Sequence, residues 1–582
     1  MCGIAGIVTA DGAPPDAGAL DRLAAALGHR GPDGSGRHVR GGIGLVQTRL
    51  AIIDLEGGRQ PIFDPAGRAI VANGEIYNYR ELRAEMAGTR FVTESDCEPP
   101  LHLYAAIGLD FADRLRGMYA IAIDDPVADR VVLARDPFGI KPLYLCEGAW
   151  GVAFASEAQA LIAAGLVEPR VDGTVLARHL QLQFATGCET IFAGIRRLAP
   201  GETVAIERGR VVASRRRRAL PEGGFQPGDA RSLRDRLDRV LQESVDLHQR
   251  ADVPYGMFLS GGIDSSALLA MMARLNPRPV LAFTAGFPGT GVHDERAHAR
   301  ALAKAVGARH VEVDFGAADF WNLLPAVAAA MDDPAADYAC LPTYKLAQVA
   351  RAEVKVILAG EGGDELFGGY GRYRAATRMW PMARPMRRRG TFDRFDVFRL
   401  PLAGWRDGIA AAERAEALPG RSRLQTVQAV DCADWLPNDL LVKADRCLMA
   451  NGIEGRVPFL DPEVAAFAFR LPDRFKLRHG LGKWLLRQWL AGILPQAEPF
   501  ARKHGFTVPV AEWLAARPEI GQLVARQPGI AEICKPGAVE GLFRQAGAGH
   551  ACWTLLFTAL WHQHHILGRR AEGDAFAALG GG

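Results

Sequence analysis

The sequence predicts two domains in one chain: an α+β layered domain, followed by an α/β domain with a parallel sheet and many helices. The first 200 residues contain short β-branched runs separated by Gly, Pro and Asp turns, without a regular alternation of strand and helix. Beyond residue 230, helical periodicity dominates, and two apolar runs are each followed by a Gly-rich turn and a helix. A chain of 582 residues is also too long for one ordinary core.

Local patterns place the expected elements of both domains. In the first domain, β-branched or alternating runs predict strands at residues 42–47, 69–72, 118–123 and 131–134. Apolar residues at helical spacing predict helices at residues 79–86 and 100–107. In the second domain, the apolar runs 253–259 and 354–358 predict parallel strands with a ligand at their carboxyl ends.

Composition shifts between residues 205 and 230. Four consecutive arginines, Arg215 to Arg218, precede a Gly- and Pro-rich stretch over residues 221–228, which is typical of a linker. The last residues end in glycines, which favours a frayed terminus. We therefore expect domains over residues 2–205 and 231–570, a linker over 206–230, and a flexible tail over 571–582.

Composition excludes several classes of protein. The formal net charge is only +3, and the arginine runs at 215–218 and 387–389 lack interleaved aromatic residues. This favours solvated charges over the alternative, a nucleic-acid or membrane patch. The nine cysteines form no CxxC pair or Cys/His cluster, so neither a zinc site nor a disulfide framework is indicated. There is no signal-peptide pattern and no apolar run of about 18 residues. We expect a cytoplasmic protein that binds neither nucleic acid nor membrane.

The chain opens with Met1-Cys2-Gly3, and Cys2 is small enough for the initiator methionine to be removed. Cys2 would then carry both a thiol and a free α-amine. A free thiol titrates near pH 8.5 and an α-amine near pH 8, so the amine can accept the thiol proton, directly or through water. Gly3 leaves room for a substrate carbonyl to approach the sulfur. Cys2 is therefore a candidate nucleophile, and a buried structural cysteine is the alternative.

Polar residues elsewhere in the first domain could complete a site for an amino-acid amide. The Asn73 side chain and the Gly74 backbone N–H are suitable donors to an oxyanion. Arg49 could pair with a substrate α-carboxylate. Glu75 and Asp96 could hold the α-ammonium. Each residue taken alone could equally be a turn former or a surface charge.

The order of these segments resembles the class II glutamine amidotransferase domain. The matching segments are MCGIAG at 1–6, HRGPDG at 29–34, RLAIID at 49–54, NGEIYN at 73–78, SDCE at 95–98 and RDPFGIKPLY at 135–144. The resemblance implies an N-terminal-nucleophile fold and glutamine hydrolysis. It implies Cys2 as nucleophile, Asn73 with Gly74 as oxyanion donors, and glutamine contacts from Arg49, Leu50, Ala51, Ile52, Ile53, Asn73, Gly74, Glu75 and Asp96. Pro99 and Pro100 depart from the aliphatic residues expected there.

A second constellation follows the strand that ends at Leu259. The heptad SGGIDSS at residues 260–266 opens a helix, so its backbone N–H groups and the helix N-terminus can face a phosphate. No lysine follows the glycines, which excludes the common P-loop. Asp264 and the acidic Gly-rich turn AGEGGDELFGGY at 359–370 could hold Mg²⁺. Lys483 is a candidate to neutralise phosphate charge, and a helix-surface lysine is the alternative.

These segments, with KADR at 443–446, EGRVPFLD at 454–461 and KWLLR at 483–487, resemble the synthetase domain of the glutamine-hydrolysing asparagine synthetases. The resemblance implies nucleotide contacts from Leu259, Ser260, Gly261, Gly262, Asp264, Ser265, Ser266, Ala285, Ala359 and Gly360. It places Glu361 where a carboxylate supports formation of β-aspartyl-AMP, and Asp264 and Asp364 where acids bind magnesium pyrophosphate. Two departures are Ala359, where serine is common, and Asn451-Gly452, which replaces a serine-bearing segment.

The expected reaction couples two sites. Glutamine hydrolysis at Cys2 would release ammonia, and ATP with Mg²⁺ would activate aspartate for amidation to asparagine. The substrates would be glutamine, aspartate and ATP, and an enclosed passage between the domains would protect the ammonia. The family also implies a homodimer. An amidotransferase with another carboxylate acceptor, such as a peptide, sugar acid or antibiotic precursor, shares every motif. A regulatory protein with an inactive synthetase half is disfavoured by the intact heptad 260–266 and the acids at 361–365.

Overall fold

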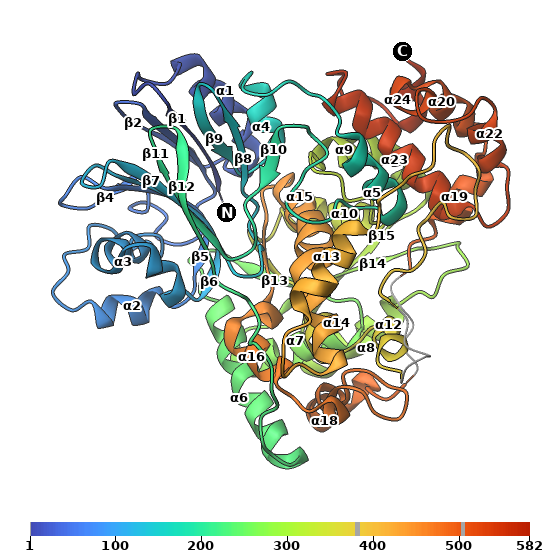
Figure 1. Ribbon diagram of the computed structural model, residues 1–582. Helices are drawn as coiled ribbons and strands as arrows, with labels where there is room; N and C mark the ends of the chain where they lie inside the picture. The colour runs from blue at the N-terminus through green and yellow to red at the C-terminus, as the bar shows by residue number, and fades with distance from the viewer. Residues whose placement is uncertain (1, 379–384, 502–506, 582) are drawn as a thin grey trace.

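The structure of the chain, a computed structural model, describes residues 2–378, 385–501 and 507–581. Met1, whose removal the sequence predicts, and Gly582 lie outside the described residues. In Figure 1 the strands of the first half gather on one side of the molecule, and the helices of the second half surround a smaller sheet on the other. Among the described residues, no helix combines the length and the apolar composition needed to cross a lipid bilayer.

The first half is built from two antiparallel sheets. In spatial order, the first sheet consists of β10 Ile195–Arg197, β8 Tyr144–Gly148, β9 Gly151–Ala155, β1 Gly3–Thr9, β3 Ile43–Arg49 and β2 Gly34–Arg40. The second consists of β12 Arg210–Arg216, β11 Glu202–Glu207, β7 Arg130–Arg135, β6 Gly117–Asp125, β5 Ala69–Ile76 and β4 Ile62–Phe63.

The two sheets pack face to face, and helices cover their outer faces. Successive side chains of a strand point to opposite faces, and residues 4–8 of β1 are all apolar or glycine because both faces of the strand are buried there. Ile4 and Val8 pack against the second sheet, whereas Ala5 and Ile7 pack under α1. α1 and α4 cover the first sheet, while α2 and α3 cover the second. This helix–sheet–sheet–helix arrangement is the N-terminal-nucleophile fold that the sequence predicts.

The second half contains a five-stranded parallel sheet. Its order is β15 Arg309–Asp314, β14 Leu281–Gly286, β13 Tyr255–Phe258, β16 Val356–Leu358 and β17 Glu454–Arg456. The chain leaves β13 first toward β14 and later returns on its other side as β16. The strand order therefore reverses at β13, and a crevice at such a point is the usual ligand site of an open parallel sheet.

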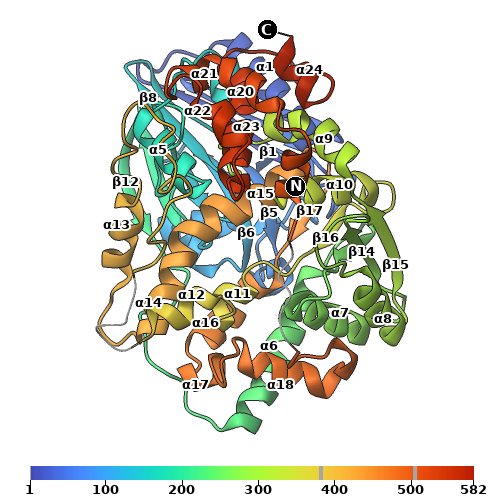
Figure 2. The same cartoon turned by 90° about the vertical axis from the view of Figure 1, so that its right-hand side faces the viewer.

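Helices cover both halves (Figures 1 and 2). In the first half they are α1 Ala17–Ala26, α2 Tyr79–Glu85, α3 Pro99–Ile107, α4 Ala158–Ala163 and α5 Gly173–Leu182. Around the parallel sheet they are α6 Ala230–His248, α7 Ile263–Leu275, α8 Arg296–Val306, α9 Ala317–Ala330, α10 Cys340–Ala350, α11 Gly363–Phe367, α12 Gly371–Ala376, α13 Asp407–Glu416, α14 Arg423–Val430, α15 Leu441–Met449, α16 Pro462–Phe469, α17 Asp473–Lys476 and α18 Trp484–Ile493. The C-terminal group is α19 Val510–Ala516, α20 Ile520–Arg526, α21 Pro528–Ala531, α22 Ala538–Phe543, α23 Gly549–His565 and α24 Ala575–Gly580.

The predicted fold class is confirmed, but two expected irregular segments are ordered elements. Residues 210–216, expected in the linker, form strand β12, because they pair with β11 along its whole length. Residues 575–580, expected in the flexible tail, form α24, which buries Ala575 and Leu579 near α9. Pro99, the unexplained departure, is the first residue of α3, a position where the missing N–H of proline has no helical partner to lose.

Candidate active sites in the two halves

Cys2 is held from both sides at the start of β1. Its backbone N–H donates to Asn73 Oδ1 at 3.1 Å, and its carbonyl accepts from Arg30 Nε at 3.2 Å. Burial raises the pKa of the Cys2 thiol, whereas hydrogen bonds from the Leu50 backbone and the Gln47 side chain act in the opposite direction. A nearby base is therefore needed to generate the thiolate, and the free α-amine of Cys2 can act as that base.

Asn73 and Gly74 are consecutive residues of β5, and Asn73 contacts the backbone of Cys2. Asn73 is fully buried; its Oδ1 accepts from the Cys2 N–H, and its Nδ2 has no hydrogen-bond partner among the described residues. Gly74 has φ +153°, and a Cβ there would lie 2.0 Å from the Met118 carbonyl oxygen. An unpaired buried amide next to a backbone that only glycine can adopt is suited to receive an oxyanion.

Arg49 folds the loop that lies against the nucleophile. Its guanidinium donates to the carbonyls of Ile53, Asp54 and Leu55 at 3.3, 2.6 and 2.9 Å. Leu50, Ile52 and Ile53 pack into a core shared with the second half, and the Ala51 N–H donates to an Asp33 oxygen at 2.8 Å. The structure therefore gives Arg49 a loop-holding role, and the predicted contact with a substrate carboxylate stays a prediction.

Glu75 and Asp96 are both buried beside this loop. The Ile76 N–H donates to Asp96 at 2.8 Å, and burial raises the pKa of Asp96 to about 6. Burial, with the neighbouring Asp96, raises the pKa of Glu75 well above its usual range. Glu75 lies 3.3 Å from Arg456 of β17, the cation nearest to it in the second half. Arg456 also pairs with Glu454 at 2.6 Å, so the carboxyl groups around it outnumber the cation, and such a cluster can accept an ammonium group.

The second half contains a cavity of about 480 Å³ at the carboxyl ends of β13, β14 and β16. Predicted residues that line it are Leu259, Ser260, Gly262, Asp264, Ser265, Ala285, Ala359, Gly360, Glu361 and Asp364. Gly261 lines an adjoining cavity of about 360 Å³. Ser266 lines neither, but its buried Oγ lies in the first turn of α7 without a hydrogen-bond partner among the described residues.

The loop before α7 has the conformation expected of a phosphate cradle. Gly261 has φ +71°, and Ser265 Oγ both accepts from the Ser260 N–H at 3.3 Å and donates to the Gly262 carbonyl at 3.1 Å. These bonds curl the loop back over the amino end of a 13-residue helix. Backbone N–H groups and the helix dipole there favour a bound anion.

Lys483 joins two predicted metal ligands. It is almost fully buried, with φ +58°, and its ammonium pairs with Asp264 and with Asp364 Oδ1, the latter at 2.6 Å. Burial opposes its charge, but the two carboxylates prevail and raise the pKa of Lys483. The carboxylates of Asp264 and Asp364 are hard oxygen donors, the kind that Mg²⁺ prefers. These residues therefore fit a magnesium ion bound together with phosphates.

Glu361 lies between the large cavity and the boundary with the first half. Its Oε2 is buried without a hydrogen-bond partner among the described residues. It also lines a small cavity of about 40 Å³, together with Ile140 and Lys141 of the first half and Ala444 of α15. Of the predicted site residues, Ala359 and Glu361 thus line both the large cavity and the small one at the seam.

Comparison with known proteins agrees with this division. The family model described as asparagine synthase matches residues 236–563, and the model described as glutamine amidotransferase domain matches residues 1–216. The chain belongs to the asparagine synthase family. It is 32% identical to "Asparagine synthetase (glutamine-hydrolyzing) 1" of Bacillus subtilis (strain 168), over 92% of each chain. It is 36% identical to "Putative asparagine synthetase (glutamine-hydrolyzing)" of Mycobacterium tuberculosis (strain ATCC 25618 / H37Rv), over 98% of this chain and 99% of that protein.

A third relative of the asparagine synthase family is "Asparagine synthetase B (glutamine-hydrolyzing)" of Escherichia coli (strain K12). It is 28% identical, over 89% of this chain and 84% of that protein. Membership in this family makes the chain a carbon–nitrogen ligase with a glutamine amidotransferase domain.

Sequence reasoning assigned no role to three residues that contact these two sites. Arg30, in the HRGPDG segment, binds the Cys2 carbonyl and reaches Asp445 of α15. Leu182 and Gln183, from the first half of the chain, line the synthetase cavity. Gln183 has φ +72°, its Nε2 donates to Thr554 Oγ1 at 3.3 Å, and its carbonyl accepts from the Ala336 N–H at 2.7 Å. The quoted motifs contained Arg30 and Asp445, but spacing alone does not pair them.

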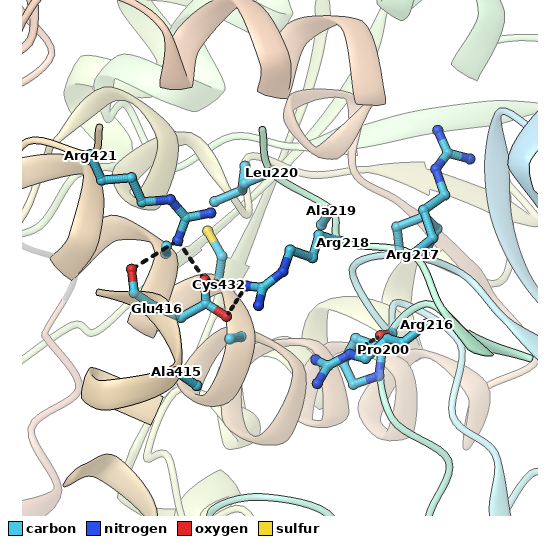
Figure 3. A pocket seen from close by; sticks show the side chains of 13 residues that line it. Pro200, Arg216, Arg217, Arg218, Ala219, Leu220, Ala415, Glu416, Arg421 and Cys432 are labelled. Carbon is cyan, nitrogen blue, oxygen red and sulfur yellow. Dashed lines mark hydrogen bonds and ion pairs between the residues drawn. The ribbon is translucent and has the colours of Figure 1, made fainter. Parts of the chain in front are cut away.

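Three residues of the arginine run, Arg216 to Arg218, border a further cavity, of about 270 Å³, on the seam between the halves (Figure 3). Arg218 pairs with both oxygens of Glu416, each at 3.1 Å, and Arg421 pairs with the same carboxylate at 2.5 Å. The Arg216 Nε donates to the Pro200 carbonyl at 2.9 Å. Arg218 thus ties the end of the first half to α13.

Proposed function

We propose that the chain is a glutamine-dependent asparagine synthetase that amidates aspartate. It would hydrolyse glutamine at Cys2, activate aspartate with ATP as β-aspartyl-AMP, and release asparagine, glutamate, AMP and pyrophosphate. The observation that carries the proposal is the pairing of two distinct sites across one seam. Cys2 lies against Asn73 on one side, and the cavity with Glu361 and the loop before α7 lies on the other.

The first half-reaction follows from the geometry around Cys2. The thiolate attacks the side-chain carbonyl carbon of glutamine, while the α-amine takes the thiol proton and passes it to the leaving nitrogen. Asn73 Nδ2 and the Gly74 N–H stabilise the oxyanion. The C–N bond breaks, ammonia leaves, and water hydrolyses the thioester to glutamate. Glu75 and Asp96 hold the α-ammonium of glutamine.

The second half-reaction takes place in the large cavity. An oxygen of the aspartate β-carboxylate attacks the α-phosphorus of ATP, the bond to the β-phosphate oxygen breaks, and pyrophosphate leaves onto the loop before α7. Ammonia then attacks the acyl carbon and AMP departs. Glu361 accepts the proton that the attacking nitrogen loses. Lys483 balances phosphate charge, and Mg²⁺ held by Asp264 and Asp364 would screen the triphosphate.

Transfer of ammonia between the sites is supported by the cavity that Glu361 shares with Ile140 and Lys141. Burial lowers the pKa of Lys141, and the carboxylates of Asp445 and Glu454 oppose that shift. A partly apolar, enclosed opening favours neutral ammonia over the charged ammonium ion. In bulk water ammonia would be protonated to ammonium, which is not a nucleophile.

The proposal is tested by measuring asparagine and AMP with glutamine or ammonium as nitrogen donor. The wild type should form both products with aspartate and either donor, and should prefer aspartate over peptide or sugar-acid acceptors. Cys2→Ala should abolish the glutamine-dependent reaction and keep the ammonium-dependent one. Cys188→Ala, at an exposed cysteine, is the matched control and should keep both. Aspartate-independent activity, or simultaneous loss of both reactions in Cys2→Ala, would refute the proposal.

A further inference from the structure

Arg387 presents an unsatisfied cation to the synthetase cavity. It lines this cavity, and its Nη2 is buried without a hydrogen-bond partner among the described residues. Its guanidinium stacks on two rings, 4.5 Å from the centroid of Trp435 and 5.2 Å from that of Phe184. Stacking fixes the plane of the guanidinium but supplies no hydrogen-bond acceptor. A buried guanidinium nitrogen without an acceptor is costly unless a ligand supplies one.

Asp439 presents an unsatisfied carboxyl oxygen to the same cavity. Its Oδ2 accepts from Trp435 Nε1 at 2.5 Å, whereas its buried Oδ1 has no hydrogen-bond partner among the described residues. The neighbouring Asp337 already has a cation, since Lys443 Nζ lies 3.1 Å from its Oδ2. Asp439 therefore has a carboxyl oxygen that still needs a donor, as Glu361 has in the same cavity.

Trp435 holds the two charges in a fixed relation. Arg387 stacks on the face of its indole, and Asp439 accepts from its ring N–H. Trp435 and Asp439 lie four residues apart in the π-helical segment Asp431–Leu440, a distortion that often accompanies function. No ion pair joins Arg387 and Asp439 within the described part of the chain. The cavity thus offers a guanidinium nitrogen without an acceptor and a carboxyl oxygen without a donor, both positioned by Trp435.

We propose that Arg387 and Asp439 bind the zwitterionic head of the amino-acid acceptor, Arg387 its α-carboxylate and Asp439 its α-ammonium. This inference rests on the proposed function and narrows it, because it requires an α-amino dicarboxylic acid. The head group satisfies both unpaired charges at once, and the second carboxylate of the acceptor is left for the nucleotide. Glu361 and the loop at residues 260–266 line the same cavity, where that second carboxylate would be activated.

The test is ATP–pyrophosphate exchange by the full chain with three acceptors. L-aspartate carries both head groups, succinate lacks the ammonium, and β-alanine lacks the α-carboxylate. The variants are Arg387→Met, Arg387→Lys and Asp439→Asn, with Arg388→Met as matched control at an exposed neighbour. Arg387→Met should raise the KM for aspartate by about a hundredfold and leave the KM for ATP unchanged. Arg387→Lys should lose less, because it keeps the charge but not the planar fork.

The analogues separate binding from a merely structural effect. In the wild type aspartate should be preferred over both analogues. Arg387→Met should remove the preference over β-alanine, and Asp439→Asn should remove the preference over succinate. If Arg387→Met does not fold, the Asp439→Asn comparison decides alone. Unchanged KM and unchanged preferences in the variants overturn this inference while the proposed function stands. Absence of aspartate-dependent exchange in the wild type instead overturns the proposed function itself.

Discussion

Arg30 and Asp445 form a two-pronged ion pair that crosses the boundary between the halves, with Nη1–Oδ2 at 2.8 Å and Nη2–Oδ1 at 3.1 Å. Both side chains are buried, and Arg30 also binds Glu157 at 2.7 Å. The same guanidinium holds the Cys2 carbonyl. Asp445 belongs to α15, whose Lys443 lines the synthetase cavity. The backbone of the nucleophile is therefore anchored to a helix of the other active site.

Loss of this pair should destabilise the whole chain. Asp445→Ala leaves Arg30 buried with one carboxylate fewer, which should lower the free energy of unfolding by about 3–5 kcal/mol. Urea denaturation measures the change. Glu85→Ala is the control, because its pair with Arg114 is about half exposed and should contribute less than about 1 kcal/mol. Equal stability of Asp445→Ala and the wild type would contradict the prediction.

Gly74→Ala should impair glutamine hydrolysis selectively. The added Cβ would meet the Met118 carbonyl, so β5 must shift and the Gly74 N–H leaves its position beside Asn73. Removal of one oxyanion donor typically costs about a hundredfold to a thousandfold in kcat. Release of glutamate should fall by this factor, while synthesis from ammonium persists. Gly173→Ala, at a position with open space around it, should behave as the wild type.

Glutamine use should weaken below about pH 6, where Asp96 takes up a proton in the folded protein. A neutral Asp96 cannot balance the substrate ammonium, so kcat/KM for glutamine should fall about tenfold per pH unit below that value. The pH profile of glutamate release measures this, and Asp96→Asn should be weak and flat across the range. A wild-type profile without a decline below pH 6 would exclude this role.

The same carboxyl has an opposite effect on stability. Its folded pKa lies above the ordinary value of 3.8, so the folded state binds the proton more tightly than the unfolded state does. The contribution of Asp96 to stability is therefore complete below about pH 4 and is lost as pH rises through 6. Thermal denaturation across this window should show that loss in the wild type and not in Asp96→Asn.

Lys483→Leu should remove the synthetase reaction and spare the glutaminase. The change leaves Asp264 and Asp364 facing each other without their shared cation, and it removes a charge from the phosphate site. AMP formation should fall by at least about a hundredfold, while glutamate release continues. Lys535→Leu, at an exposed pair with Asp396, is the control for loss of a lysine. Normal AMP formation in Lys483→Leu would assign this lysine a purely structural role.

Removal of divalent cations should stop the same reaction. Chelation with EDTA should abolish AMP formation, and added Mg²⁺ should restore it, because Asp264 and Asp364 fit a magnesium ion with phosphates. Glutamate release by the Cys2 site should continue throughout. Full AMP formation in the chelated enzyme would contradict the metal assignment.

Local sequence patterns predicted the elements that consecutive residues form. The strand, glycine-rich loop and helix around Ser260 form one continuous segment, so spacing was enough to place them. β12 was missed because it is an edge strand with charged, exposed residues rather than an apolar run. α24 was missed because its final glycines obscure two buried apolar positions.

Contacts between residues far apart in the sequence cannot be predicted from such patterns. Arg30 and Asp445 are 415 positions apart, and the partnership becomes visible only when the halves are packed together. The sequence predicted solvated charges at residues 387–389. Arg388 and Arg389 are exposed, but Arg387 is not. Its stacking on Trp435 depends on tertiary structure, which overrides the compositional signal.

Gln183 sets a condition on how such chains can be recombined. A chimera joined within residues 217–229 would take a complete first half from one parent and a complete parallel-sheet half from another. Gln183 of the first parent would then contact the second parent's residues at positions 554 and 336. It would also line the second parent's cavity. Grafts between homologues should therefore carry α5 and its following turn together with the synthetase half, or acceptor preference will change with the graft.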